Sequence, residues 1–339
     1  MTFTHDRIKE IAKDVVKTSF FKYFLCREDV STRHILLHRF FAEEANIRSA
    51  IGGLETSLGI TLWERIATKI ASENGFDILD PKIDFLQPET LPTSIRNILA
   101  EHKESREVAE ANIPISQYVC ALNTALAQLP TAEIPINFKR LTKGSGVDIY
   151  LRKGNDEYAF DLKTVQINAG SGTKYNDSLM KWLAFRAIFQ KSKGTNFSFS
   201  AHIVIPYDPH VTSDWWTEFG DRAYPLDHHD LKLGNEFWDF ISGCTDSITS
   251  IKDAFDELVA EDFPNTYREC LHKSGAAVSI KILKKVSHVT CVTPQNEISL
   301  GFGDKLSWQC DNCSNLFRAS IKWFLKTRSC GTCHTRFFS

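Results

Sequence analysis

The chain has 339 residues, of which 42% are hydrophobic and 24% are charged, and its formal net charge at pH 7 is −2. This composition is typical of a globular protein with a real core and excludes a largely disordered chain, and the length admits one large domain or two. No apolar run reaches the roughly 20 residues needed to span a bilayer, and the N-terminus lacks the profile of a signal peptide, so we expect a cytosolic protein. The near-neutral charge argues only weakly against nucleic-acid binding, because a local basic groove is what matters.

Helices are expected throughout residues 5–75, where apolar side chains recur at helical spacing. The second helical run covers 31–50 and the third covers 62–72. Between these two runs, Gly59 suits a helix end and Thr61 suits the N-cap of a new helix.

A β-hairpin follows further along the chain. Residues 76–98 hold several prolines and are expected to form loop and short strand, and residues 98–130 are expected to be helical. Two strand-like runs, 146–151 and 157–164, are then joined by the polar turn 152–156.

The order of elements after the hairpin predicts an α/β fold with a mixed central sheet. A small, flexible loop is expected at 168–174, an aromatic-rich helix at 179–190, a buried strand at 202–207, helix at 235–262 and two strand-like runs at 276–290. From about residue 291 the composition shifts toward Cys, Trp, Phe and basic residues, so we predict domains at 1–290 and 291–339.

The hairpin carries a candidate metal site. Asp161 and Lys163 are two positions apart on a strand and project from one face, and the hairpin can bring Asp148 beside them. Two carboxylates and an ammonium on one surface call for a divalent cation, and Asp148 and Asp161 could hold Mg²⁺, with the Leu162 carbonyl as a further ligand. Such an ion would activate water against a phosphodiester, and Lys163 would orient or deprotonate that water. The alternative is a strand whose charged side chains simply face solvent.

This hairpin resembles the core of the PD-(D/E)xK nucleases, with Val147-Asp148 at the Pro-Asp position and Asp161-Leu162-Lys163 as the DxK. Arg48-Ser49-Ala50, Glu55 to Gly59 and Leu62-Trp63-Glu64 resemble the helical N-terminal signature of type II restriction endonucleases. Further segments resemble restriction enzymes of the TdeIII type: Asp161 to Asn168, Met180 to Arg186, Pro206-Tyr207 with Trp215-Trp216, and Glu236 to Gly243.

The resemblance implies a restriction-endonuclease-like core with a helical N-terminal part, and Mg²⁺-dependent cleavage of double-stranded DNA at a short palindromic site of GGNCC type. It assigns Glu64 to the metal site as a third acid, although a solvated surface acid is the alternative. The class further implies a homodimer in a prokaryotic cytosol, no membrane partner, and a DNA methyltransferase that protects the same site without forming a stable complex.

Candidate DNA contacts follow the catalytic strand. Lys174, Lys181 and Arg186 could contact phosphates, and Asn176 could read a base edge. The alternatives are a plain connector around Lys174 and a pairing of Arg186 with an acid.

The end of the chain predicts a zinc module. Cys310-Asp311-Asn312-Cys313 and Cys330-Gly331-Thr332-Cys333 are two C-x-x-C knuckles, whose four thiolates would complete a closed, structural Zn²⁺ site. We therefore expect a small zinc ribbon with Cys310, Cys313, Cys330 and Cys333 as ligands. Its basic residues are further candidate DNA contacts: Arg318, Lys322, Lys326 and Arg328.

Two other functions fit the same residues. One is a PD-(D/E)xK nuclease of repair or phage defence, with specificity for a DNA structure or modification. The other is a DNA-binding protein without catalysis, against which the intact Asp148, Asp161 and Lys163 argue.

Overall fold

We describe a computed structural model of the chain, for residues 3–26, 39–108, 113–142, 146–163, 166–271, 288–292, 305–320, 323, 329–330 and 332–334. The chain divides into two compact units. The first comprises Met1–Ile11 and Trp63–Lys252, and the second comprises Ala12–Leu62 and Asp253–Ser339. The predicted domain boundary at residue 290 stays a prediction.

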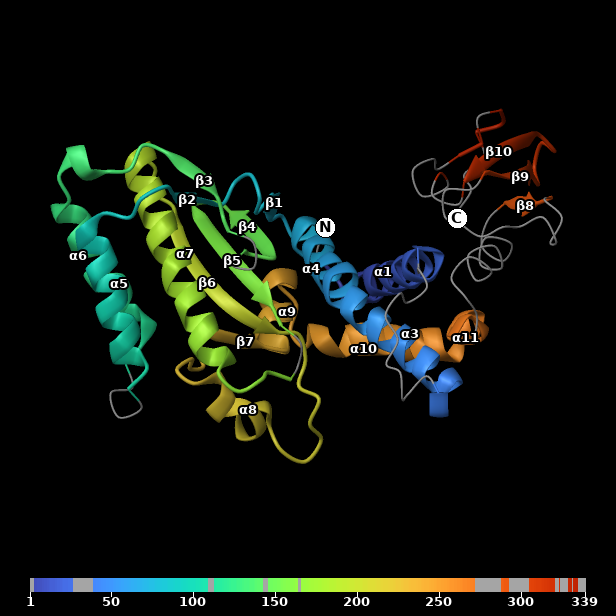
Figure 1. Cartoon of the computed structure of the whole chain (residues 1–339), viewed down its shortest axis with the longest axis horizontal. Coiled ribbons are helices and arrows are strands. Elements are labelled where there is room, and N and C mark those ends of the chain that lie inside the picture. Colours follow the sequence, from blue (N-terminus) through green and yellow to red (C-terminus); the bar gives the residue numbers. More distant parts are fainter. Residues whose placement is uncertain are drawn as a thin grey trace. The chain divides into compact units, whose positions relative to one another are not determined.

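A five-stranded mixed sheet forms the centre of the first unit, as the order of elements predicted (Figure 1). The strand order is β1-β4-β5-β6-β7, with the first three strands antiparallel and β5, β6 and β7 parallel. The strands are β1 (Asp77–Leu79), β4 (Ile149–Lys153), β5 (Asp156–Leu162), β6 (Ser198–Ile205) and β7 (Leu231–Leu233). The turn between β4 and β5 is tight, because Lys153 pairs with Asp156 and Gly154 takes the left-handed conformation with φ of 62°.

Helices cover both faces of this sheet (Figure 1). Helix α7 (Ser171–Lys193) lies on one face, where its Trp182 packs with Ala159 of β5. On the other face, Phe160 of β5 packs edge-to-face against Phe237 of α9 (Asn235–Ser242). The alternation of β5 side chains between the two faces explains why its residues are buried on both.

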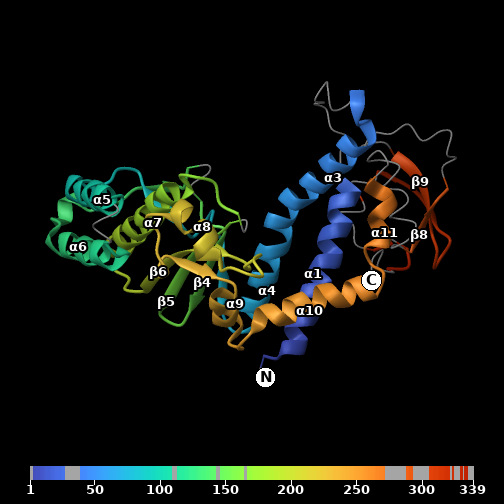
Figure 2. The same cartoon turned by 90° about the horizontal axis from the view of Figure 1, so that it is seen from below.

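A second helical layer packs on α7 and consists of α5 (Thr93–Arg106) and α6 (Ile115–Gln128), as Figure 2 shows. The buried Tyr118 hydroxyl donates to the Met180 carbonyl and ties α6 to α7. The remaining elements of this unit are α4 (Glu64–Glu73), β2 (Leu86–Pro88), the 3₁₀ turn Thr131–Glu133, β3 (Phe138–Arg140) and α8 (Trp215–Ala223).

The second unit combines helices with a three-stranded sheet of order β10-β9-β8. Figure 2 shows α3 beside α1, where the Tyr23 hydroxyl donates to the Ala50 carbonyl at 2.6 Å. Phe24 stacks on Tyr267 at a centroid distance of 4.9 Å and closes a small aromatic core. The elements are α1 (His5–Cys26) and α10 (Ser247–Ala260), which both begin in the first unit, α3 (Ala42–Leu58), α11 (Asn265–Arg268), the 3₁₀ turn Glu269–Leu271, β8 (Val289–Cys291), β9 (Lys305–Cys310) and β10 (Leu316–Ser320).

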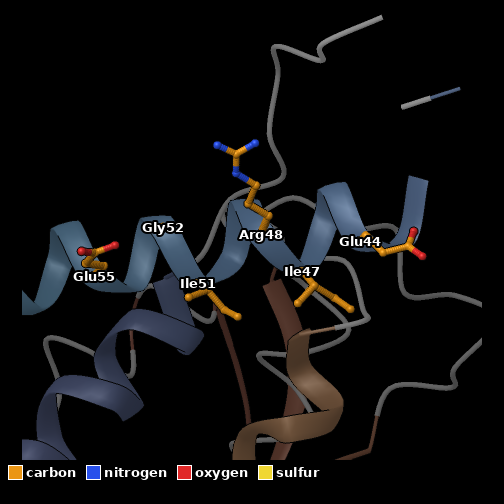
Figure 3. A pocket seen from close by; sticks show the side chains of 6 residues that line it. All are labelled: Glu44, Ile47, Arg48, Ile51, Gly52 and Glu55. Atoms are coloured by element: carbon orange, nitrogen blue, oxygen red, sulfur yellow. The ribbon is translucent and has the colours of Figure 1, made fainter. Parts of the chain in front are cut away.

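Side chains of α3 line a pocket, which is shown in Figure 3. Ile47 and Ile51 project on one side of the helix and Arg48 on the other. The lining residues are Glu44, Ile47, Arg48, Ile51, Gly52 and Glu55.

Two expectations about local structure are wrong. The predicted helix end at Gly59 is a helical residue with φ of −49°, and the chain continues through a π-helical turn, Gly59–Trp63, directly into α4. The expected loop 168–174 becomes helix from Ser171, because Gly170 adopts the left-handed conformation with φ of 78° and α7 starts immediately after it. Each helix of the described residues is too short or too polar to span a bilayer.

Candidate active site and metal centre

Asp148 and Asp161 meet at the end of the β4–β5 hairpin. The register pairs Ile149 with Phe160, so one further step places Asp148 opposite Asp161, on the same face of the sheet. The Asp148 backbone N–H donates to the Phe160 carbonyl at 2.9 Å, and the Asp148 carboxylate accepts from the Leu162 N–H at 2.9 Å. The backbone of the hairpin therefore fixes the Asp148 carboxylate beside Asp161.

Lys163 completes this group of side chains. Its ammonium forms an ion pair with Asp161, and its backbone N–H donates to the Val204 carbonyl of β6 at 2.9 Å. Burial disfavours the charge on this ammonium, but Asp161 and Asp148 together outweigh that effect and raise the pKa of Lys163.

Asp161 and Glu64 each lie in an environment that disfavours the charged form of the carboxyl group. Burial raises the pKa of Asp161 to about 8, and the adjacent Asp148 adds to this shift against the opposing effect of Lys163. Burial and, next, the charge of Asp148 raise the pKa of Glu64 to about 7, against the opposing effects of Lys163 and Lys82. Glu64 is the first residue of α4, directly after the π-helical turn.

These acids fit a divalent cation by their chemistry. Two carboxylates that face one another in a buried place repel, and oxygen ligands are what Mg²⁺ prefers. Within the described part of the chain, Glu64, Asp148 and Asp161 do not all have carboxylate oxygens within 4.8 Å of one another. The structure thus brings Asp148, Asp161 and Lys163 together, and Glu64 is near enough to interact through charge.

Arg186 lies in the interior of the first unit and not on the surface. Its guanidinium donates to both carboxylate oxygens of the fully buried Glu157, at 2.5 Å and 2.7 Å. The same carboxylate also accepts from the Tyr150 hydroxyl at 2.8 Å and from Arg152 at 2.7 Å. Of the two possibilities that the sequence left open for Arg186, pairing with an acid is therefore the one that the structure displays.

Asn176 is also used inside the protein. Its side chain is 0% exposed, and its carbonyl oxygen accepts from the buried Arg106 guanidinium at 2.8 Å. Arg106 also forms a buried ion pair with Asp230 and donates to the Ile113 carbonyl at 2.8 Å. This network joins the end of α5 to α7, and it leaves the Asn176 side chain unavailable to a base edge.

The two lysines of α7 lie at the surface. Lys174 is exposed in the first turns of the helix. Lys181 is 41% exposed and pairs with Asp177 at 2.6 Å. Arg318 is exposed on β10 of the second unit. The other predicted contacts lie outside the described residues: Lys322, Lys326 and Arg328.

The four C-terminal cysteines form a second candidate metal centre. Their four sulfur atoms all lie within 4.8 Å of one another, and the residues are Cys310, Cys313, Cys330 and Cys333. The Cys310 and Cys333 sulfurs are 3.7 Å apart, as are those of Cys313 and Cys330. Four thiolates at about 2.3 Å from a tetrahedral zinc ion would be about 3.8 Å apart, whereas bonded disulfide sulfurs are about 2.05 Å apart. The cluster could therefore hold zinc.

Backbone groups support one of these thiolates. The N–H groups of Cys333 and Thr332 face the Cys330 sulfur and lower the pKa of Cys330. Trp308 lies beneath the cluster, fully buried, and donates its indole N–H to the Ala319 carbonyl at 2.9 Å. The site is thus built on a small core of its own.

The first unit also depends on two buried charged residues that are not among the predicted site residues, Glu157 and Arg106. A signal for Glu157 was present in the strand period, because Glu157, Ala159 and Asp161 share one inward face and a charge there requires a partner. Arg106 gave no such signal, since it ends a helix and its acidic partner Asp230 is distant in sequence.

Asp148 directly precedes β4, and Asp161 and Lys163 lie at the end of the neighbouring β5, so this carboxylate pair and lysine could bind a divalent cation there. The chain matches the family model described as type II restriction endonuclease, HinfI, over residues 4–259, and it belongs to this family. The match supports site-specific cleavage of DNA, and it does not test the predicted resemblance to the TdeIII type. No curated protein and no solved structure matches the chain.

Proposed function

We propose that the protein is a Mg²⁺-dependent type II restriction endonuclease that cleaves double-stranded DNA at a short palindromic site. The observation that carries this proposal is the placement of Asp148 opposite Asp161, with Lys163 paired to Asp161. Family membership supplies the substrate, because the family consists of restriction endonucleases. We predict a recognition sequence of GGNCC type, which the resemblance to restriction enzymes of the TdeIII type implies.

Asp148 and Asp161 would hold the metal ion, and Glu64 would complete the acidic surround. The Leu162 N–H donates to Asp148, and the Leu162 carbonyl would serve as a further ligand. When bound, a divalent cation polarises the scissile phosphate and lowers the pKa of water. Asp161 and Glu64 have raised pKa values in the absence of a cation, and the positive charge of a bound metal ion would favour loss of the proton from each carboxyl group.

Lys163 would act on the attacking water. Its ammonium sits at the Asp161 carboxylate, and its backbone is anchored to β6. In this place it orients the water and stabilises charge on the phosphate as the new bond forms.

Exposed cations would bind the DNA backbone. The described candidates are Lys174 in the first turns of α7, Lys181 in the middle of α7 and Arg318 in the cysteine module, with Lys322, Lys326 and Arg328 as further predicted contacts. The four-cysteine module would be a structural zinc ribbon. A palindromic target asks for a homodimer, and a prokaryotic host would need a methyltransferase for the same site.

Incubating the protein with unmethylated phage DNA and Mg²⁺ tests this function. Discrete fragments, whose sequenced ends share one motif, would support a restriction enzyme. Smears, or cleavage confined to modified DNA, would indicate a repair or defence nuclease. Retardation without cleavage would indicate a DNA-binding protein.

The site is tested with a matched pair of substitutions on one strand. Asp161→Ala should abolish cleavage while binding of DNA survives. Asp156→Ala removes an acid at the other end of β5 and should leave cleavage intact. Full activity of Asp161→Ala would refute the assignment.

A further inference from the structure

We propose that Tyr175 is a positioning residue for Lys163, whose ammonium it holds over the face of its ring. The ammonium nitrogen lies 5.5 Å from the centroid of the Tyr175 ring. This is within the roughly 6 Å over which a cation is attracted to an aromatic face. The inference rests on the proposed function, because it concerns how Lys163 is oriented in that site.

Lys163 needs such a contact because its side chain is flexible. A lysine ammonium is a point charge at the end of four rotatable carbons, so its location depends on what surrounds it. The side chain is 29% exposed, and its carboxylate partner is Asp161. Asp161 is also a proposed metal ligand, and oxygen atoms that bind a cation are weaker partners for an ammonium. The ring of Tyr175 offers a contact that uses none of these oxygens.

The position of Tyr175 is fixed by the backbone at the start of α7. Gly170 ends the preceding loop in the left-handed conformation, and Gly172 lies against the end of α8. A Cβ atom at residue 172 would be 2.0 Å from the Ala223 carbonyl oxygen, so the two segments approach as closely as glycine allows. Tyr175 follows within one helical turn and packs against the core beneath the sheet.

Both partners of the contact are therefore anchored independently. Tyr175 is held by α7, and the Lys163 backbone is held by the Val204 carbonyl of β6. The ring thus limits where the ammonium can move, which favours the orientation needed for the reaction. A 1 Å error in such a position can lower a rate about 100-fold.

The test compares Tyr175→Leu, which removes the ring, with Tyr175→Phe, which retains it. Phe199→Leu is the matched control, because Phe199 packs against the same core and is paired with Glu157, at the opposite end of the β5–β6 ladder from Lys163. Single-turnover cleavage in Mg²⁺, DNA affinity in Ca²⁺ and urea unfolding are measured for each protein.

We expect Tyr175→Leu to cleave about 10-fold more slowly, which corresponds to about 1.4 kcal/mol and lies within the range of a partly desolvated cation–π contact. Its DNA affinity should stay within about twofold, and Tyr175→Phe should recover cleavage to within about threefold, since the ring face remains. Phe199→Leu should lose stability without losing cleavage. Should Tyr175→Leu fail to fold, Tyr175→Met replaces it.

Three results would overturn the inference: unchanged cleavage by Tyr175→Leu, equal impairment of Tyr175→Phe and Tyr175→Leu, or equal slowing by Phe199→Leu. Lys163→Met separates this failure from failure of the proposed function. Loss of cleavage in Lys163→Met with normal cleavage in Tyr175→Leu refutes only the role of Tyr175. Full cleavage by Lys163→Met refutes the site itself.

Discussion

Replacing Arg186 by Met should destabilise the protein, because it leaves the carboxylate of Glu157 buried with half of its positive partners. Glu157 is 0% exposed, and Arg186 supplies two of its hydrogen bonds and one of its two ion pairs. Removing one partner of a buried ion pair costs about 3–5 kcal/mol. Since Tyr150 and Arg152 still bond to the carboxylate, we expect the low end, about 3 kcal/mol in the free energy of unfolding.

Arg152→Met is the matched control for this substitution. Arg152 pairs with the same carboxylate, but its side chain is 30% exposed, so water replaces it more readily. We expect a loss of about 1 kcal/mol, as for a charge-assisted hydrogen bond near the surface. The double variant Arg186→Met with Glu157→Gln removes the unpaired charge and should recover about 2 kcal/mol of the loss.

Urea unfolding of the four proteins measures these differences, and DNA binding is measured where each remains folded. If Arg186 is structural, folded Arg186→Met binds DNA as the wild type does, with the same salt dependence. A structural role for Arg186 is refuted if Arg186→Met is as stable in urea as the wild type and the slope of its log affinity for DNA against log salt concentration decreases by about one, because that is the behaviour of a phosphate contact.

Three further predictions concern pH, zinc and a close backbone approach. The raised pKa of Asp161, about 8, means that the metal-free native protein retains a proton that the unfolded chain releases. Its melting temperature should therefore fall as the pH rises from about 5 to about 8, and Mg²⁺ should oppose this fall. An equal fall of the melting temperature in Asp161→Asn would contradict this explanation. Metal analysis should find one zinc ion per chain, lost on combined Cys310→Ser and Cys330→Ser substitution, and a folded, zinc-free wild type would exclude the site. Gly172→Ala should lower the free energy of unfolding by about 3 kcal/mol, because its Cβ atom would clash with the Ala223 carbonyl, and wild-type stability would show that α7 can shift.

Residues whose partners are close in the sequence could be predicted from the sequence. The period of a strand and a short turn suffice to place Asp148, Asp161 and Lys163 together, because the register follows from the hairpin. The two C-x-x-C knuckles similarly carry their own geometry, and the structure gathers their four sulfurs. The α/β fold with a mixed sheet followed from the order of helices and strands.

Tertiary structure alone decided the role of residues whose partners are distant in the chain. Arg186 and Asn176 lie on a helix with both polar and apolar neighbours, and nothing local indicates which face is covered. Their partners, Glu157 on β5 and Arg106 on α5, are brought to them only by the packing of those elements against α7. Charge and hydrogen-bonding capacity are properties of a residue type, whereas burial and access to DNA depend on the whole fold. For this reason the candidate metal ligands of the hairpin could be predicted from the sequence, whereas the burial of Arg186 and Asn176 follows only from the packing of α7 against its neighbours.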